Sequence, residues 1–124
     1  MDIRKSVLGA EFVEKSFKAA DEFNMPLQEL VTEYCWGAVW GNEDLSYKTR
    51  SMLNLAMLSA LNRPQEFRTH MRGALRNGVT REEIRAVLMQ VAIYCGVPAG
   101  VEAFRIGREV LAEYDAAASA APKA

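Results

Sequence analysis

The stretch from Ser46 to Asn77 constrains the fold more than any other part of this 124-residue chain. It predicts two helices separated only by the short connection Asn62-Arg63-Pro64. Pro64 suits a first helical position, because its ring presets φ and its missing N–H would be unbonded there anyway. The preceding helix is predicted from Tyr47 to about Leu61, with Ser46 as its N-cap. The rest of the chain is therefore expected to be organised around this helix pair.

The first helix of the pair has apolar side chains nearly all round its circumference. A helix of this kind is normally enclosed by the rest of the protein. We therefore expect it to be a buried central helix. Its apolar residues are Met52, Leu53, Leu55, Ala56, Met57, Leu58, Ala60 and Leu61.

The second helix, from Pro64 to Asn77, carries His70, the only histidine of the chain. At 100° per residue His70 lies one turn after Glu66, so the two side chains can share a hydrogen bond that fixes the imidazole tautomer and favours its charged form. Gly73 leaves room on the same face for another backbone or a small ligand. The alternative is that His70 is a hydrogen-bonded packing residue. The helix has an apolar stripe of Phe67, Met71, Ala74 and Leu75, and a basic ridge of Arg68, Arg72 and Arg76.

The remaining sequence predicts further helices and no convincing strand. Apolar residues recur at helical spacing over residues 3–21, and a second helix is expected from Asn24-Met25-Pro26 to Glu33-Tyr34-Cys35-Trp36-Gly37. Trp36 and Trp40 are expected to flank a short irregular segment. Thr80-Arg81-Glu82-Glu83 is a capping box that begins another helix, and Gly96-Val97-Pro98 begins the last. We therefore predict an all-α fold of about six helices in a single domain, residues 1–124, with a frayed tail from about residue 115.

Charge and composition limit the classes of partner. The formal net charge of −1 gives no support for nucleic-acid binding, whereas residues 46–85 hold eight basic residues against three acidic ones and would attract a small anionic molecule. No run approaches the length of a membrane span, and the charged N-terminus does not resemble a secretory signal, so a cytoplasmic protein without a membrane partner is expected. Cys35 and Cys95 are expected to be reduced, buried thiols, and a single histidine offers no metal site.

Several segments, taken in order, resemble the carboxymuconolactone decarboxylase family over roughly residues 25–112. No single segment is unusual, but the ordered series is specific. The segments are Glu33-Tyr34-Cys35-Trp36-Gly37, Lys48-Thr49-Arg50-Ser51, Asn62-Arg63-Pro64 through His70 to Arg72-Gly73-Ala74, Asn77-Gly78-Val79-Thr80-Arg81-Glu82-Glu83-Ile84, and Tyr94-Cys95-Gly96-Val97-Pro98.

The resemblance implies a carboxy-lyase of alkylhydroperoxidase-like helical fold that works without a cofactor. The implied reaction is decarboxylation of 4-carboxymuconolactone, a small anionic lactone, to 3-oxoadipate enol-lactone in the catabolism of protocatechuate. It also implies self-association into a homo-oligomer, such as a hexamer built from dimers.

The chemistry of this reaction selects candidate residues. Loss of carbon dioxide leaves a delocalised enolate, whose oxygen must be stabilised and whose carbon must receive a proton. His70 suits this task near neutral pH, with Glu66 holding its ring. Glu33, at an aromatic-rich helix end, is a further catalytic candidate, although packing at the edge of the core is the alternative for it. Arg50 and Arg63 are candidates for binding carboxylates, because each opens one helix of the central pair.

One departure from the wider superfamily bears on the function. The alkylhydroperoxidase-type relatives carry C-x-x-C-x-x-x-H, and this chain has Arg63-x-x-Glu66-x-x-x-His70 at the matching positions. The absence of both cysteines disfavours a second class, a thiol oxidoreductase, since that chemistry needs a thiolate and a resolving partner. A third class, a non-catalytic assembly module that docks through the basic ridge, is disfavoured because acidic helices elsewhere balance that charge.

Overall fold

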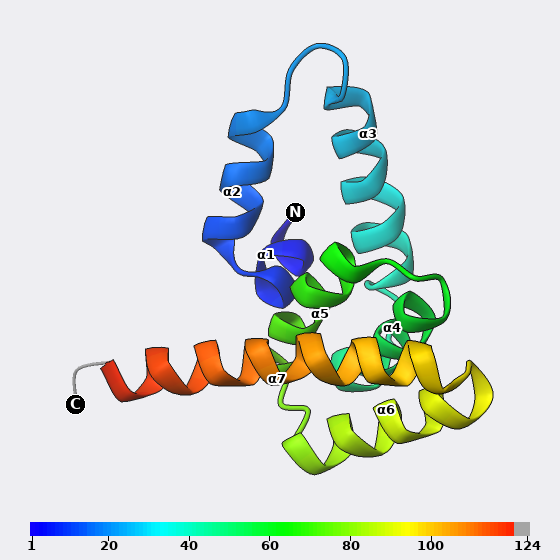
Figure 1. The fold of residues 1–124 in the computed structure, drawn as a ribbon. Helices are drawn as coiled ribbons and strands as arrows, with labels where there is room; N and C mark the ends of the chain where they lie inside the picture. The colour runs from blue at the N-terminus through cyan, green and yellow to red at the C-terminus, as the bar shows by residue number, and fades with distance from the viewer. Residues whose placement is uncertain (121–124) are drawn as a thin grey trace.

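The structure, a computed structural model, describes residues 1–120, and over that range its regular secondary structure is helical, without a strand (Figure 1). The predicted all-α class is confirmed, with seven α-helices and one π-helix in place of about six helices. They are α1 (Asp2–Leu8), α2 (Ala10–Ala19), α3 (Met25–Leu30), the π-helix η1 (Val31–Val39), α4 (Tyr47–Ala60), α5 (Pro64–Arg76), α6 (Arg81–Tyr94) and α7 (Val97–Ala120).

The helices form two packed groups (Figure 1). Helices α4 to α7 enclose the larger core, which is centred on Leu55, Phe67, Met71 and Leu88. Helices α1, α2 and η1 enclose a smaller core that includes Val7, Trp36 and Trp40. Helix α5 lies between the two groups, since it packs against α7 on one side and against α1 on another. The backbone of α1 comes close to α5 at Gly73. A Cβ built on Gly73 would lie 3.2 Å from the carbonyl oxygen of Val7. The room predicted at Gly73 is thus occupied by another backbone.

The predicted helix ends around the central pair are confirmed. The Ser46 hydroxyl accepts a hydrogen bond from the Thr49 N–H, and Pro64 is the first residue of α5. Asn62 has a φ of 58°, the left-handed conformation that ends a helix. Thr80 and Glu83 form the capping box at the start of α6. These features are local and depend only on neighbouring residues.

The prediction of one helix over residues 3–21 is wrong, because Gly9 interrupts it. Gly9 has a φ of +95°, which side-chain-bearing residues rarely adopt, and it separates α1 from α2. A Cβ at this position would lie 3.0 Å from a guanidinium nitrogen of Arg76, so the break also makes room for the end of α5. The break lets α1 lie against α5 while α2 points away (Figure 1).

The segment after α3 also differs from the prediction, since the helix does not end at Gly37. It continues as η1 to Val39, and the Trp40 N–H bonds to the Cys35 carbonyl, five residues back, at 2.9 Å. Trp36 and Trp40 are four residues apart, so the continued helix places both on one face. The rings of Trp36 and Trp40 consequently lie 4.9 Å apart, centroid to centroid, instead of flanking an irregular segment.

Helix α4 is less buried than predicted. Ser51 and Leu55 are its only fully buried residues, while the side chains of Leu53 and Met57 are 46% and 51% exposed. No helix within residues 1–120 covers the apolar side that these two residues share. Cys95 is likewise exposed rather than buried, whereas Cys35 is half-buried, and neither sulfur forms a disulfide.

Helix α7 extends beyond the point where fraying was expected. It continues through Asp115, which pairs with Arg81 of α6, to Ala120. Residues 121–124, the rest of the predicted tail, lie outside the described residues. Within residues 1–120 no helix combines the length and the apolar character needed to cross a membrane.

Two glycines of α7 provide a matched test of packing against α6. A Cβ on Gly100 would lie 2.6 Å from the Ala92 Cβ, whereas one on Gly107 would lie 3.6 Å from its nearest neighbour, the Leu88 Cδ1. We expect Gly100→Ala to lower the free energy of unfolding by about 1–3 kcal/mol, because helix backbones must separate. Gly107→Ala should be neutral or stabilising by up to about 1 kcal/mol. Urea denaturation checks both, and equal effects would contradict this account of the packing.

Candidate functional site around His70

His70 lies where α5 meets α4 and the end of η1. Its Nδ1 lies 3.3 Å from the Asn54 Nδ2 of α4. The rings of Trp36 and Trp40 lie nearly parallel to the imidazole, with centroids at 6.1 Å and 6.5 Å and interplanar angles of 9° and 27°. The histidine is therefore held by one amide and bounded by the two indoles.

The expected hydrogen bond between Glu66 and His70 is absent from the described part of the chain, and Asn54 takes its place. Burial lowers the pKa of His70, and the negative charge of Glu66 opposes this change without reversing it. Glu66 therefore favours the charged imidazolium, as expected, but burial sets the net direction of the pKa of His70. Desolvation of the half-buried imidazole lowers the pKa of His70 by more than the exposed carboxylate of Glu66, one turn away, raises it.

A lowered pKa of His70 links its charge to stability. The unfolded chain takes up a proton near the ordinary value of 6.5, whereas the folded protein resists protonation, so this contribution is present above pH 6.5 and is lost as the pH falls through the folded pKa. We expect the free energy of unfolding to fall more steeply between pH 7.5 and 5.5 in the wild type than in His70→Gln. Urea titrations at both pH values measure this. Parallel losses in the two proteins would contradict it.

Arg50 lies one turn before Asn54 on α4, so the two side chains share a face of that helix. Its Nη2 donates to the backbone carbonyl of Asn42 at 3.0 Å and to the side-chain oxygen of Asn42 at 3.3 Å. Its Nε is buried and has no hydrogen-bond partner in the described structure. Tyr47, one turn earlier on the same face, packs on Trp40 with centroids 5.8 Å apart. The guanidinium is thus oriented while part of its donor capacity remains unused.

The other predicted residues lie apart from this arrangement. Arg63 is exposed at the N-cap of α5, about 10 Å along the helix axis from His70. Glu33 is exposed on η1, and Glu66 is exposed on α5. Among residues 1–120 neither carboxylate forms a hydrogen bond or ion pair with His70. The structure therefore brings together His70 and the face of α4 that carries Arg50, and it does not add Glu33 or Arg63.

Sequence reasoning missed Asn54, Trp36 and Trp40 as neighbours of His70. A signal was present for Asn54, a polar residue among apolar ones four positions after Arg50. The two tryptophans could not be placed, because their alignment depends on the helix continuing past Gly37 as the π-helical η1. The sequence shows no sign of that winding.

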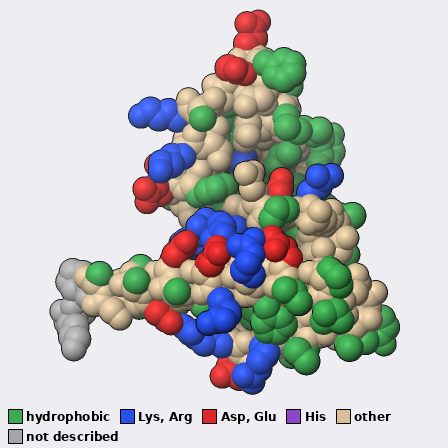
Figure 2. Space-filling model, in the orientation of Figure 1, with side chains coloured by type: hydrophobic (Ala, Val, Ile, Leu, Met, Phe, Trp, Pro, Cys, Tyr) green, Lys and Arg blue, Asp and Glu red, His purple; other side chains and the backbone are tan. Residues whose placement is uncertain are grey.

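The basic ridge of Arg68, Arg72 and Arg76 is largely neutralised within the chain. Arg68 pairs with Glu109, and the Arg72 Nη2 lies 3.2 Å from the Glu113 Oε2. Figure 2 shows basic and acidic side chains interleaved along this side of α7. The predicted balance by acidic residues elsewhere is confirmed for Arg68 and Arg72, so the ridge is not an open docking face.

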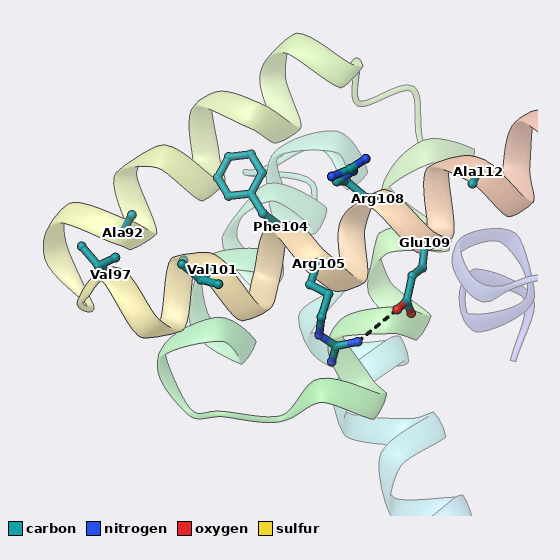
Figure 3. Close-up of a pocket in the computed structure, with 9 residues that line it drawn as sticks. Ala92, Val97, Val101, Phe104, Arg105, Arg108, Glu109 and Ala112 are labelled. Carbon is teal, nitrogen blue, oxygen red and sulfur yellow. Dashed lines mark hydrogen bonds and ion pairs between the residues drawn. The ribbon is translucent and has the colours of Figure 1, made fainter.

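Two surface grooves lie away from His70. One, of about 730 Å³, runs along α7 beside α6 and is lined by Val97, Val101, Phe104 and Arg108, while Arg105 turns toward Glu109 (Figure 3). Another, of about 400 Å³, lies between α4 and α6. Over the described range no cluster of three or more His, Cys, Asp or Glu side chains could hold a metal ion.

Comparison with known proteins gives consistent matches over most of the chain. Residues 26–109 match the carboxymuconolactone decarboxylase family. The chain is 41% identical over 109 residues to nitrosuccinic acid decarboxylase of Metarhizium robertsii, covering 88% of this chain and 76% of the relative. It is 34% identical over 110 residues to 4-carboxymuconolactone decarboxylase of Acinetobacter baylyi, covering 89% and 82%. An uncharacterised 15.0 kDa protein of Paracoccus denitrificans is 30% identical over 118 residues, covering 86% and 87%.

Proposed function

The chain belongs to the carboxymuconolactone decarboxylase family, and we propose that it converts 4-carboxymuconolactone to 3-oxoadipate enol-lactone in protocatechuate catabolism. It is a carboxy-lyase that needs no cofactor for this step. The C–C bond to the departing carboxylate breaks, and its electron pair moves through the ring alkene onto the lactone carbonyl oxygen. Carbon dioxide leaves, and a proton then adds to carbon.

A second substrate, nitrosuccinic acid, is favoured by one observation: the identity to the nitrosuccinic acid decarboxylase exceeds that to the lactone decarboxylase. The two acids share their reacting group. In each, the carbon that loses carbon dioxide also carries a carboxymethyl group and is bonded to an electron-accepting group, an unsaturated lactone in one and a nitro group in the other. A site for either must therefore hold a carboxylate that stays and an oxygen that gains charge.

The observation that carries the proposed site is the partly unsatisfied guanidinium of Arg50 on the α4 face that also carries Asn54, the partner of His70. Arg50 binds the carboxymethyl carboxylate, for which its planar fork is suited. His70 stabilises the negative charge that develops on the acceptor oxygen. Glu66 raises the proton affinity of His70 from one turn away. Glu33 and Arg63 retain roles only if a second copy of the chain brings them to the site.

The experiment that tests the function offers both acids to the purified protein and measures released carbon dioxide. Turnover of 4-carboxymuconolactone well above that of nitrosuccinic acid supports the lactone reaction, and the reverse order supports the second candidate. Muconolactone, which lacks the departing carboxylate, is the matched control. If neither acid loses carbon dioxide faster than it does without the protein, the proposed function is wrong.

The thiol alternative has little support from the two cysteines. Burial raises the pKa of the Cys35 thiol, with the nearby Arg4 charge only partly opposing it, so little thiolate forms. Cys95 is exposed at the end of α6, on another element. Unpaired thiols accord with the proposed cytoplasmic location, where disulfides are rare.

We also propose that the protein works as a homo-oligomer, of which a hexamer is one form. A large apolar surface lies where α6 meets α7 and continues onto α4, and Figure 2 shows it as a cluster of hydrophobic side chains. Ile93 is 75% exposed and Val101 is 63% exposed. Monomeric proteins rarely expose so much apolar surface, and a second copy offers a matching face.

The interface is tested by a charge placed on that surface. We expect Ile93→Asp to reduce the mass measured by light scattering after gel filtration to that of a smaller assembly, because each copy would bury an unpaired carboxylate. Ile93→Val, which keeps an apolar side chain at the same place, should leave the mass unchanged. A wild-type protein that is monomeric at micromolar concentration would contradict the proposal.

A further inference from the structure

The hydrogen bond between Asn54 and His70 determines where the imidazole carries its proton. The side-chain nitrogen of asparagine can only donate, and it lies 3.3 Å from the His70 Nδ1. Nδ1 must then present its lone pair. A neutral imidazole has one N–H, so the proton lies on Nε2.

The surroundings of the ring favour the neutral state. The indoles of Trp36 and Trp40 offer no hydrogen-bond acceptor, and a second N–H at Nδ1 would face the N–H groups of Asn54. The charge that acts on the ring is that of Glu66 on α5; on α4 the Arg50 guanidinium is directed to Asn42, and Glu33, the acidic residue of η1, is exposed. Burial lowers the pKa of His70 despite Glu66, in agreement with this geometry.

The opposite nitrogen is available to a ligand. Within residues 1–120, the buried side-chain nitrogen and oxygen atoms that lack a partner are the Nε of Arg4 and the Nε of Arg50. The His70 Nε2 forms no hydrogen bond within residues 1–120, and it is not among these fully buried atoms. A small molecule that reaches the ring could therefore accept a hydrogen bond from an Nε2–H that forms none within the described protein.

We infer that Asn54 is a positioning residue that holds His70 as the Nε2–H tautomer, so that His70 acts as a neutral hydrogen-bond donor to the anionic intermediate. This inference rests on the proposed decarboxylation and assigns the role of His70 within it. The electron pair of the broken C–C bond moves onto the acceptor oxygen, to which Nε2–H donates while keeping its proton. Water protonates the carbon, and the hydroxide that it leaves combines with carbon dioxide as bicarbonate.

The tautomer can be measured directly because the chain has a single histidine. In the full-length protein labelled with ¹⁵N-histidine, the two ring nitrogens give one pair of signals. We expect the wild type at pH 7.5 to show a protonated Nε2 and an unprotonated Nδ1. A protonated Nδ1 with an unprotonated Nε2 overturns the inference without recourse to any variant.

Asn54→Asp is the informative variant, since it replaces a donor by an acceptor of nearly the same size. The carboxylate would accept from Nδ1–H, so the tautomer should invert and kcat should fall at least 10-fold with KM little changed, as expected for a donor that acts in the transition state. Asn77→Ala is the matched control. It also removes a hydrogen bond between α5 and α4, from the Asn77 Nδ2 to the Ser51 Oγ at 2.9 Å, but that bond does not touch His70.

The possible results separate this inference from the proposed function. The tautomer is read without substrate, so the absence of decarboxylation would leave the spectrum unaffected. An Asn54→Asp protein that keeps the Nε2–H signal, or that inverts it with normal kcat, overturns the role given to Asn54 even when carbon dioxide release by the wild type is confirmed. Inversion in Asn77→Ala would likewise refute a specific role for Asn54.

Discussion

Replacing His70 with asparagine is expected to leave a folded protein whose turnover is lower by about 100-fold or more. The side chain of asparagine is shorter than that of histidine and places its amide group near the position of Nδ1, where its oxygen can accept from the Asn54 Nδ2. The group that faces the substrate is thereby removed, while the contact with Asn54 is approximately retained. Carbon dioxide release under saturating substrate measures the loss, and circular dichroism with thermal unfolding checks the fold.

A second substitution at the same position sharpens this result. Glutamine places its amide nitrogen near the position of Nε2, so His70→Gln should keep a donor toward the substrate and retain more turnover than His70→Asn. Equal losses in the two variants would indicate that His70 transfers a proton. Near-normal turnover in a well-folded His70→Asn protein would end the case for His70 and direct attention to Glu33 and the arginines.

Replacing Arg50 with glutamine is expected to lower kcat/KM by about 100-fold, mostly through a higher KM. The carboxymethyl carboxylate is present in both the ground state and the transition state, so the interaction that holds it contributes to binding in both. Loss of a charge-assisted pair in a partly enclosed site costs about 2–3 kcal/mol. Initial rates over a range of substrate concentrations separate KM from kcat.

Two further variants define what Arg50 contributes. Arg50→Lys keeps the charge and loses the planar fork, and it should recover only part of the affinity. Arg63→Gln tests the other arginine that the sequence suggested, and its exposed position along α5 leads us to expect nearly normal kinetics. A larger defect in Arg63→Gln than in Arg50→Gln would mean that the carboxylate binds at the start of α5.

The parts of the fold that the sequence predicted are those fixed by local chemistry. The caps at Ser46 and Thr80 and the start of α5 at Pro64 all depend on residues within one turn. The break at Gly9 was missed because apolar spacing continues across it, and the close approach of Arg76 from another helix cannot be read from neighbouring residues.

The candidate site was only partly accessible from the sequence. His70 and Arg50 could be chosen by residue type, since few side chains suit proton chemistry or carboxylates. Glu66 was wrongly expected to be the hydrogen-bond partner of His70. Helical periodicity shows which residues are neighbours on the same helix, but it does not show whether a residue of another helix lies closer. Asn54 is the partner because α4 packs against α5, and this packing belongs to the tertiary structure.

The two indoles beside His70 give this protein an internal optical probe. Trp36 and Trp40 are the only tryptophans in the chain, and both lie close to its only histidine. An imidazolium quenches indole fluorescence by accepting an excited electron, whereas a neutral imidazole quenches it far less. The emission of the unlabelled protein should therefore dim as His70 takes up a proton, with a midpoint on the acid side of 6.5. One titration in a fluorimeter would thus follow the charge of a single ring without a label or a substrate.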